Sequence, residues 1–369
     1  MSRKLITIST IMTLMSTSIM ADAPNVAADI APIHSLVSKV MDGVGEPKLV
    51  IQSGASPHGY RLRPSEAKAL QDANLIFWMG EELTPWLDGA IDTLASNASV
   101  TSLLDQEGVV LHEFREGALF EAHDHSAHDD HDDHKDHDDH DDHDDHDDHD
   151  DHKDHDDHDD HDDHDDHDDH KDHEDHDDHD DHDDHDDHDD HDDHDDHGHS
   201  AHDPHAWLSP ENAKLWLNII ASKLSVADPE NAATYFTNAA AGQAEIEEMI
   251  SEVSATLKPV KGGKFVVFHD AYQYFENDFD FYASGAISLS DASDPSPARI
   301  AKIQKRIRDE GIQCVLAEPQ FKQGLVATVM EGSEATASVI DPLGADIKPG
   351  PKLYTQLIKN MAKTLRDCL

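Results

Sequence analysis

Residues 228–258 read DPENAATYFTNAAAGQAEIEEMISEVSATLK, and this stretch decides how the rest of the chain is organised. Asp228-Pro229-Glu230 is a typical helix start, because a short polar residue followed by proline favours a first turn. Only one glycine, Gly242, and no further proline lie before Leu257. A helix of roughly 28 residues is about 40 Å long, which is enough to connect two lobes. Two shorter helices broken near Gly242 are the alternative.

Short β-rich runs alternate with helical stretches on both sides of this helix. Before it, we expect strands at 26–30, 48–52, 75–79 and 100–104, and helices at 33–41, 63–73, 83–95 and 209–224. After it, we expect strands at 265–268, 286–289, 314–317 and 337–340, and helices at 271–278, 297–310, 323–332 and 354–368. This alternation predicts an α/β fold with two lobes, each a mostly parallel sheet wrapped by helices.

The predicted domain boundaries follow from this pattern. The N-terminal lobe comprises 24–122 and 203–227, the connecting helix 228–258, and the C-terminal lobe 259–369. A His- and Asp-rich insert, 123–202, interrupts the N-terminal lobe. Of the 33 histidines and 81 acidic residues in the chain, the insert holds 28 and 44.

The insert repeats His-Asp-Asp and contains no apolar residue from His131 to His197. Such a segment cannot bury a core, and we expect it to be disordered without metal. Imidazole and carboxylate groups both bind first-row metals. The insert is therefore interpreted as a loop that binds extra ions weakly, as a collector or a sensor. A solvated polyanion that merely tolerates metal is the alternative.

Charge and composition exclude one class of partner. The net charge is −54, most of it carried by the insert, and no basic stretch is available to follow a phosphate backbone. We therefore expect no nucleic-acid partner. The rest of the chain has the composition of an ordinary, mildly acidic globular protein, and we expect a monomer.

The N-terminus and the two cysteines indicate an exported protein. Residues 1–23, MSRKLITISTIMTLMSTSIMADA, have the layout of a secretory signal peptide, whereas a membrane anchor would need a longer apolar run. In an oxidising compartment Cys314 and Cys368 favour a disulfide, because Cys368 on the last helix could reach back to the strand that starts at Cys314. A pair of metal thiolates is the alternative, but no CxxC spacing supports it.

Five histidines lie outside the insert. Of these, His58 follows a strand in GASPHGY (54–60), His205 precedes a helix in DPHAWLSP (203–210), and His269 follows the strand FVVF (265–268). Asp341 also follows a strand. Ligands bind beyond the carboxyl ends of strands in open α/β sheets. Three neutral imidazoles with a carboxylate or a water suit tetrahedral Zn²⁺, although each histidine alone could be an ordinary hydrogen-bonding residue.

The two other histidines are weaker candidates. His34 follows the first strand and could face the same cleft as a secondary ligand, but a helix-start histidine with ordinary hydrogen bonds is the simpler interpretation. His112 precedes the insert and could join it in a second metal site. A solvated histidine at a strand end is the alternative.

The chain resembles the zinc-specific solute-binding proteins of ABC importers. The resemblance rests on motifs in the same order over essentially all of the chain outside the signal peptide and the insert: GASPH (54–58), LRPS (62–65), HAWLSP (205–210), VFHDAY (267–272), AEPQF (317–321) and LG (343–344). It implies two α/β lobes joined by a long helix, a metal ion in the cleft and a periplasmic location. It also implies delivery of Zn²⁺ to a membrane permease, without enzymatic activity.

The resemblance also assigns residues. Its three histidine ligands correspond to His58, His205 and His269, and its fourth position corresponds to Asp341, which water can replace. In related manganese-binding proteins the third position is a glutamate instead of a histidine. The resemblance therefore implies that His269 favours zinc. A disulfide between a late strand and the last helix fits Cys314 and Cys368.

Two other functions remain open from the residues. The first is a periplasmic storage or chaperone protein whose main capacity is the insert. The second is a zinc hydrolase, in which three protein ligands leave an open water and Glu318 acts as a base. The chain contains no HExxH helix, which argues against the hydrolase.

Overall fold

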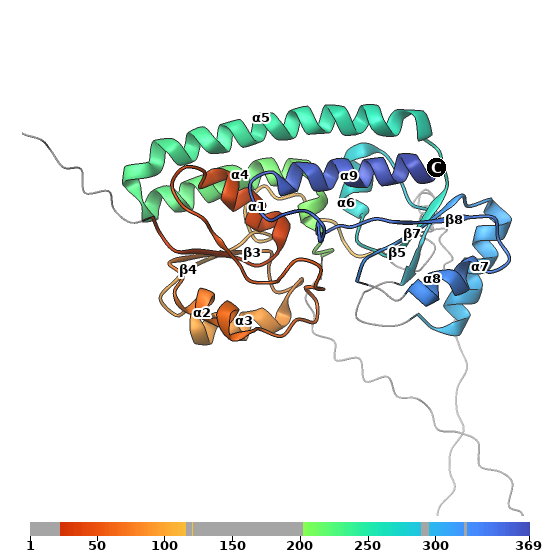
Figure 1. Ribbon diagram of the computed structural model, residues 1–369, viewed down its shortest axis with the longest axis horizontal. Helices are drawn as coiled ribbons and strands as arrows, with labels where there is room; N and C mark the ends of the chain where they lie inside the picture. The colour runs from red at the N-terminus through yellow and green to blue at the C-terminus, as the bar shows by residue number, and fades with distance from the viewer. Residues whose placement is uncertain (1–22, 116–119, 121–201, 289–294, 321–322) are drawn as a thin grey trace, which may run out of the picture. The chain divides into compact units, whose positions relative to one another are not determined.

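The computed structural model describes residues 23–115, 120, 202–288, 295–320 and 323–369, which form one compact unit (Figure 1). The predicted signal peptide and nearly all of the predicted metal-binding insert lie outside the described residues. Within the described ranges, no helix has both the length and the apolar character that crossing a membrane requires.

The first half of the fold is a four-stranded sheet with the order β2-β1-β3-β4, and all of its strand pairs are parallel. Its elements are β1 (Val26–Ala28), α1 (Ala31–Val40), β2 (Lys48–Leu49), α2 (Pro64–Gln71), β3 (Leu75–Trp78), α3 (Pro85–Leu94), β4 (Ser99–Ser102) and, after the insert, α4 (Pro210–Ala227). Each predicted element is present, with ends shifted by a few residues. The strand predicted at 48–52 is the shortest, because only two of its residues join the ladder.

The second half repeats this arrangement, with a parallel sheet of order β6-β5-β7-β8. Its elements are β5 (Phe265–His269), α6 (Gln273–Phe279), β6 (Ala286–Ser288), α7 (Pro297–Glu310), β7 (Cys314–Ala317), α8 (Gln323–Met330), β8 (Thr336–Val339) and α9 (Leu353–Cys368). The predicted fold of two helix-wrapped parallel sheets is confirmed. The proposed lobe boundaries stay a prediction.

The long connecting helix is present as α5 (Ala232–Leu257), preceded by a short 3-10 turn at Pro229–Asn231. It runs above both sheets and lies against α4 and α9 (Figure 1). The alternative of a break at Gly242 is wrong. A Cβ atom at Gly242 would lie 2.9 Å from Cδ1 of Leu217 on α4 and 3.1 Å from Cγ of Lys39 on α1. Glycine at this position thus permits close helix packing rather than a turn.

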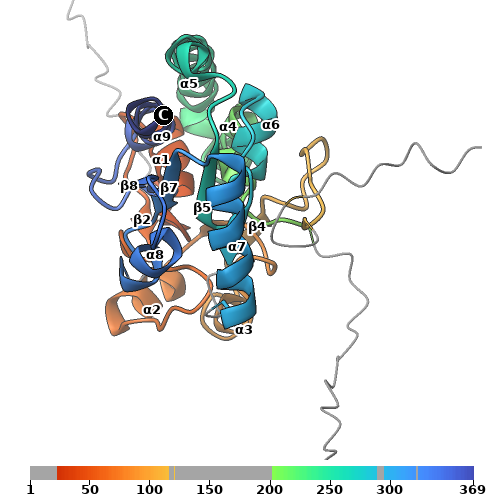
Figure 2. The ribbon, with the colours of Figure 1, turned by 90° about the vertical axis from the view of Figure 1, so that its right-hand side faces the viewer.

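The two central strands of each sheet, β1 and β3 in the first and β5 and β7 in the second, are buried on both faces, as strands of parallel sheets usually are. All five residues of β5 are buried. Val266 and Phe268 point into a smaller core shared with α7 and α8, whereas Phe265 and Val267 point into the larger core that includes α5 and α9. Figure 2 shows α7 and α9 on opposite sides of β5 and β7. Because alternate residues of β5 pack into different cores, the strand is packed on both faces. This packing holds its carboxyl end in place.

The two cysteines form a disulfide that joins β7 to the end of α9, with 5.7 Å between the Cα atoms of Cys314 and Cys368. The alternative of two metal thiolates is therefore wrong. The bridge fastens the C-terminus to β7, the strand of the second sheet that leads to Glu318.

Candidate metal centre

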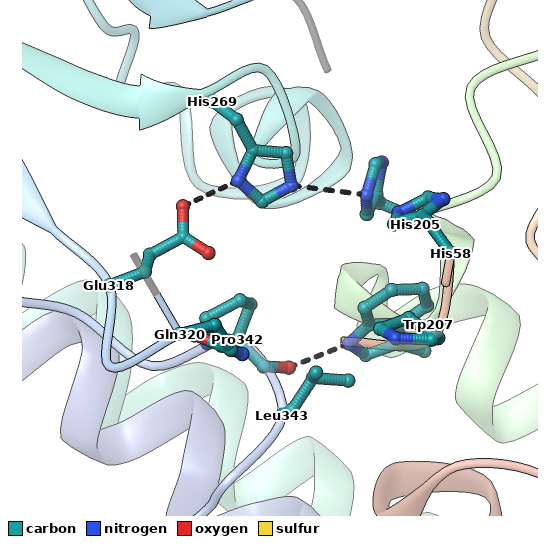
Figure 3. A pocket seen from close by; sticks show the side chains of 9 residues that line it. His58, His205, Trp207, His269, Glu318, Gln320, Pro342 and Leu343 are labelled. Carbon is teal, nitrogen blue, oxygen red and sulfur yellow. Dashed lines mark hydrogen bonds and ion pairs between the residues drawn. The ribbon is translucent and has the colours of Figure 1, made fainter. Parts of the chain in front are cut away.

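Three histidines from distant parts of the sequence meet at the carboxyl ends of the strands (Figure 3). His58 lies in the loop after β2, His205 immediately before the 3-10 turn Ala206–Leu208, and His269 is the last residue of β5. His205 and His269 are only 5 % and 4 % exposed. His58 is half-buried.

The ring nitrogens of these histidines converge. Each residue offers one ligand atom, and the three atoms all lie within 4.8 Å of one another. The Nε2 atoms of His205 and His269 are 3.4 Å apart. Two nitrogens bound tetrahedrally to one zinc at about 2.0–2.1 Å stand about 3.3–3.4 Å apart. These two imidazoles are therefore already spaced as two ligands of a single zinc ion.

Buried carboxylates orient two of the three imidazoles. Nδ1 of His205 lies 2.6 Å from Oδ1 of Asp203, and Nδ1 of His269 lies 2.6 Å from Oε1 of Glu318. With Nδ1–H donating to a carboxylate, each ring keeps the lone pair of Nε2 free for a metal. The two acids thus select the tautomer that a zinc site needs.

Tryptophan side chains hold the loops around the site. Trp86 on α3 donates a hydrogen bond of 2.7 Å to the carbonyl oxygen of Pro57, next to His58. Trp207 donates one of 2.8 Å to the carbonyl oxygen of Pro342, from the loop after β8 (Figure 3). The first bond fixes the loop that carries His58, and the second ties the segment next to His205 to the second half of the chain.

The histidines line a cavity of about 10 Å³. The remaining lining residues are mainly apolar or amide-bearing, with one acid: Pro57, Trp207, Glu318, Gln320, Pro342 and Leu343. A volume of this order holds one water molecule. The cavity therefore has the size of a single ion.

Asp341, predicted as the fourth ligand, is not in the group of converging ligand atoms within the described residues. Its carboxylate accepts hydrogen bonds from the backbone N–H groups of Leu343, Gly344 and Ala345, at 3.0, 2.9 and 2.5 Å. The side chain thus shapes the turn after β8 in this conformation. A direct bond from Asp341 to zinc stays a prediction.

Asp203 and Glu318 bond to the rings of two converging histidines, and the sequence indicates these contacts only weakly. Asp203 stands two residues before His205, a spacing at which an acid can fold back onto the ring, and this signal was missed. Glu318 follows the strand β7 and was considered as a hydrolase base. It contacts His269 instead, and the two residues are 49 positions apart in the chain.

The two remaining histidines make ordinary hydrogen bonds away from the cavity. Nε2 of His34 lies 3.1 Å from the carbonyl oxygen of Pro47, and Nδ1 lies 3.4 Å from Oγ of Ser38. The ring of His112 contacts the ring of Tyr274, with centroids 4.6 Å apart and the planes tilted by 46°, and its Nε2 lies 3.1 Å from Nδ2 of Asn277. Neither belongs to the converging group. Hydrogen bonding, the simpler interpretation of His34, fits its environment.

Acid is expected to destabilise the zinc-free protein in part through His34. Burial lowers the pKa of His34, because desolvation disfavours the charged ring. As the pH falls below about 6.5, the unfolded chain binds this proton first, so stability present above that pH is lost below it. We expect His34→Gln to reduce the difference in unfolding free energy between pH 7.5 and pH 5.5. Urea unfolding with a chelator present measures the unfolding free energy at each pH. If His34→Gln leaves the difference between the two pH values unchanged, His34 does not contribute to the loss of stability in acid.

The fold and the site together define a metal-binding solute-binding protein, with two helix-wrapped sheets and three imidazoles that meet at an ion-sized cavity. The chain belongs to the ZnuA family, described as "Zinc-uptake complex component A periplasmic", whose profile matches residues 26–368. The family resemblance inferred from the motifs is thereby confirmed.

The relatives align with most of the chain. It is 45% identical over 352 residues to the "High-affinity zinc uptake system protein ZnuA" of Brucella abortus (strain 2308), covering 95% of this chain and 93% of the relative. The protein of the same name from Paracoccus denitrificans (strain Pd 1222) is 41% identical over 350 residues, with the same coverage.

Solved structures share the fold at low identity. A crystal structure of ZnuA has a TM-score of 0.64 and 19% identity, covering 94% of this chain and 99% of that one. The binding protein FpvC from Pseudomonas aeruginosa, in complex with Mn²⁺, has a TM-score of 0.63 and 14% identity, covering 94% and 98%. At these identities the likeness establishes the architecture alone.

Proposed function

We propose that this protein is a periplasmic receptor that captures Zn²⁺ and delivers it to the membrane permease of an ABC importer. The observation that carries the proposal is the convergence of His58, His205 and His269 on one ion-sized cavity. Membership of the ZnuA family supports it, as does the name of the relatives, high-affinity zinc uptake system proteins. The predicted signal peptide at 1–23 supports the periplasmic location.

The three imidazoles account for the proposed selectivity. Zn²⁺ prefers imidazole nitrogen, whereas Mg²⁺ and Ca²⁺ require oxygen ligands. Cu²⁺ and Ni²⁺ are not rejected by ligand type, and tetrahedral geometry must discriminate against them. We propose that water completes the tetrahedron, because the carboxylate of Asp341 is already bonded to three backbone N–H groups.

Binding and release follow from the origin of the ligands. His58 and His205 come from the first half of the chain and His269 from the second, so any relative movement of the halves separates the ligand atoms. A permease that moves one half or one loop would thereby release the ion. Protons compete for the same imidazoles, so acid weakens binding.

We propose that the insert binds further metal ions, each more weakly than the three-histidine site. The support is the composition of the insert, which repeats His-Asp-Asp over most of 123–202. Storage by the insert is the competing function. It predicts a single population of weak sites and no tight one.

A zinc titration distinguishes receptor from storage protein. Residues 123–198 can be deleted while Glu113 and His202, which form a β-bridge, are kept in place. We expect the shortened chain to retain one tight site and to lose the weak ones. Loss of the tight site on deletion, with the protein still folded, would assign zinc binding to the insert and contradict the receptor function.

A further inference from the structure

Residues 112–113, before the insert, and residues 202–203, at its end, meet and form a short stem. Glu113 and His202 pair as an antiparallel bridge, and the N–H of Asp203 donates a 2.8 Å hydrogen bond to the carbonyl oxygen of His112. From this stem, Asp203 contacts the ring of the ligand His205. The segment that leads out of the insert is therefore part of the metal site.

The segment that leads into the insert carries Arg115, and its guanidinium group spans two acids of the second half. Nε of Arg115 donates to Oδ1 and Oδ2 of Asp270 at 3.0 and 3.1 Å, and Nη1 donates to Oε2 of Glu276 at 2.5 Å. Both acids are almost fully buried, at 5 % and 1 % side-chain exposure. The ring of Phe120 covers the guanidinium, with Cζ 3.6 Å from the ring centroid.

Asp270 directly follows the ligand His269, and the two residues share a tight turn. The N–H of Ala271 donates a 3.0 Å hydrogen bond to the carbonyl oxygen of His269. Fixing the carboxylate of Asp270 therefore fixes the peptide that carries the imidazole. Without the arginine, two buried carboxylates would face each other without a cation, and the turn would relax to hydrate them.

The same stem also contacts α6 beyond Asp270. Tyr274 donates a 2.7 Å hydrogen bond to the carbonyl oxygen of Asp203 and accepts a 3.1 Å hydrogen bond from the N–H of His112. Asn277 lies 3.1 Å from Nε2 of His112. The stem is thus attached to the second half by several bonds, among which Arg115 provides the ion pairs.

We propose that Arg115 is a positioning residue of the zinc site: it holds the His269–Asp270 turn against the stem of the insert and so slows zinc release without touching the ion. This inference rests on the proposed zinc-binding function. Arg115 would thus act on the tight site from the stem. This role is separate from any metal binding by the insert itself.

Zinc release from the full-length protein tests this role. Protein loaded with one equivalent of zinc is mixed with excess chelator, and the slow phase of transfer is followed. Mutations at residues that couple to a binding site without touching its ligand typically change the binding or release constant roughly 3- to 30-fold. We expect Arg115→Gln to accelerate the slow phase within that range, and Arg308→Gln, at an exposed arginine of α7, to leave it unchanged.

Arg115→Lys provides the second arm, because a lysine keeps the charge but cannot span both carboxylates. We expect release at a rate between those of the wild type and Arg115→Gln, with both variants folded by circular dichroism. Wild-type release from a folded Arg115→Gln protein would overturn the inference, as would wild-type release from a folded Arg115→Met protein if the glutamine variant does not fold. Absence of a slow phase in the wild type would instead contradict the receptor function.

Discussion

Replacing His269 by alanine is expected to weaken the tight zinc site by at least about 100-fold. A complete structural zinc site contributes roughly 10–16 kcal/mol, so one of four ligands accounts for roughly 3 kcal/mol or more. His269 is buried at the end of β5, and its Nε2 lies 3.4 Å from that of His205. The remaining residues cannot replace its nitrogen without moving the strand. Competition with a chelator of known affinity measures the change.

His112→Ala is the matched control for this variant. His112 is a histidine near the insert that lies outside the converging group, and we expect its removal to change the affinity of the tight site by less than the His269 variant does. Equal losses in both variants would mean that the insert and its stem hold the tight ion. Wild-type affinity in His269→Ala would remove His269 from the ligand set.

Replacing Glu318 by glutamine is expected to lower zinc affinity by about 10- to 100-fold, the usual effect of changing a hydrogen-bond partner of a metal ligand. The amide oxygen can still accept the Nδ1–H bond of His269, so the ring keeps its orientation. The negative charge that balances the bound ion is lost. Asp203→Asn should have a similar effect through His205, because the two carboxylates have equivalent contacts.

The exposed residue Glu334 supplies the control for the Glu318 variant. Glu334→Gln removes the same charge from the same half of the chain, without a contact to a ligand. We expect its zinc affinity to equal that of the wild type. If Glu318→Gln also binds zinc as the wild type does, the carboxylate has no role in the site beyond packing.

The fold could be predicted from local signals in the sequence. Pro297 and Gly311 bracket a helix observed at Pro297–Glu310, and Gly311 takes the left-handed conformation, with φ +66°, that ends helices. The run Cys314–Ala317 is found as the strand β7. Gly242 was ambiguous because its role is interhelical: only the packed structure reveals the atoms of Leu217 and Lys39 that exclude a side chain there.

The convergence of the three histidines could be predicted from the sequence, but the hydrogen-bond partners of their rings could not. His58, His205 and His269 stand at strand ends or a helix start, positions that α/β folds direct towards one edge. The pairing of Glu318 with His269 depends on two strands lying side by side. Asp341 met the same positional criterion as the histidines, but the sequence did not reveal that the following backbone N–H groups would bind its carboxylate.

Anomalous diffraction at the zinc edge, from crystals of the full-length protein with one equivalent of zinc, tests the central assignment directly. The account predicts that the strongest peak lies about 2.0–2.1 Å from Nε2 of His205, Nε2 of His269 and a ring nitrogen of His58. A strongest peak elsewhere, with these three imidazoles free of metal, would contradict it.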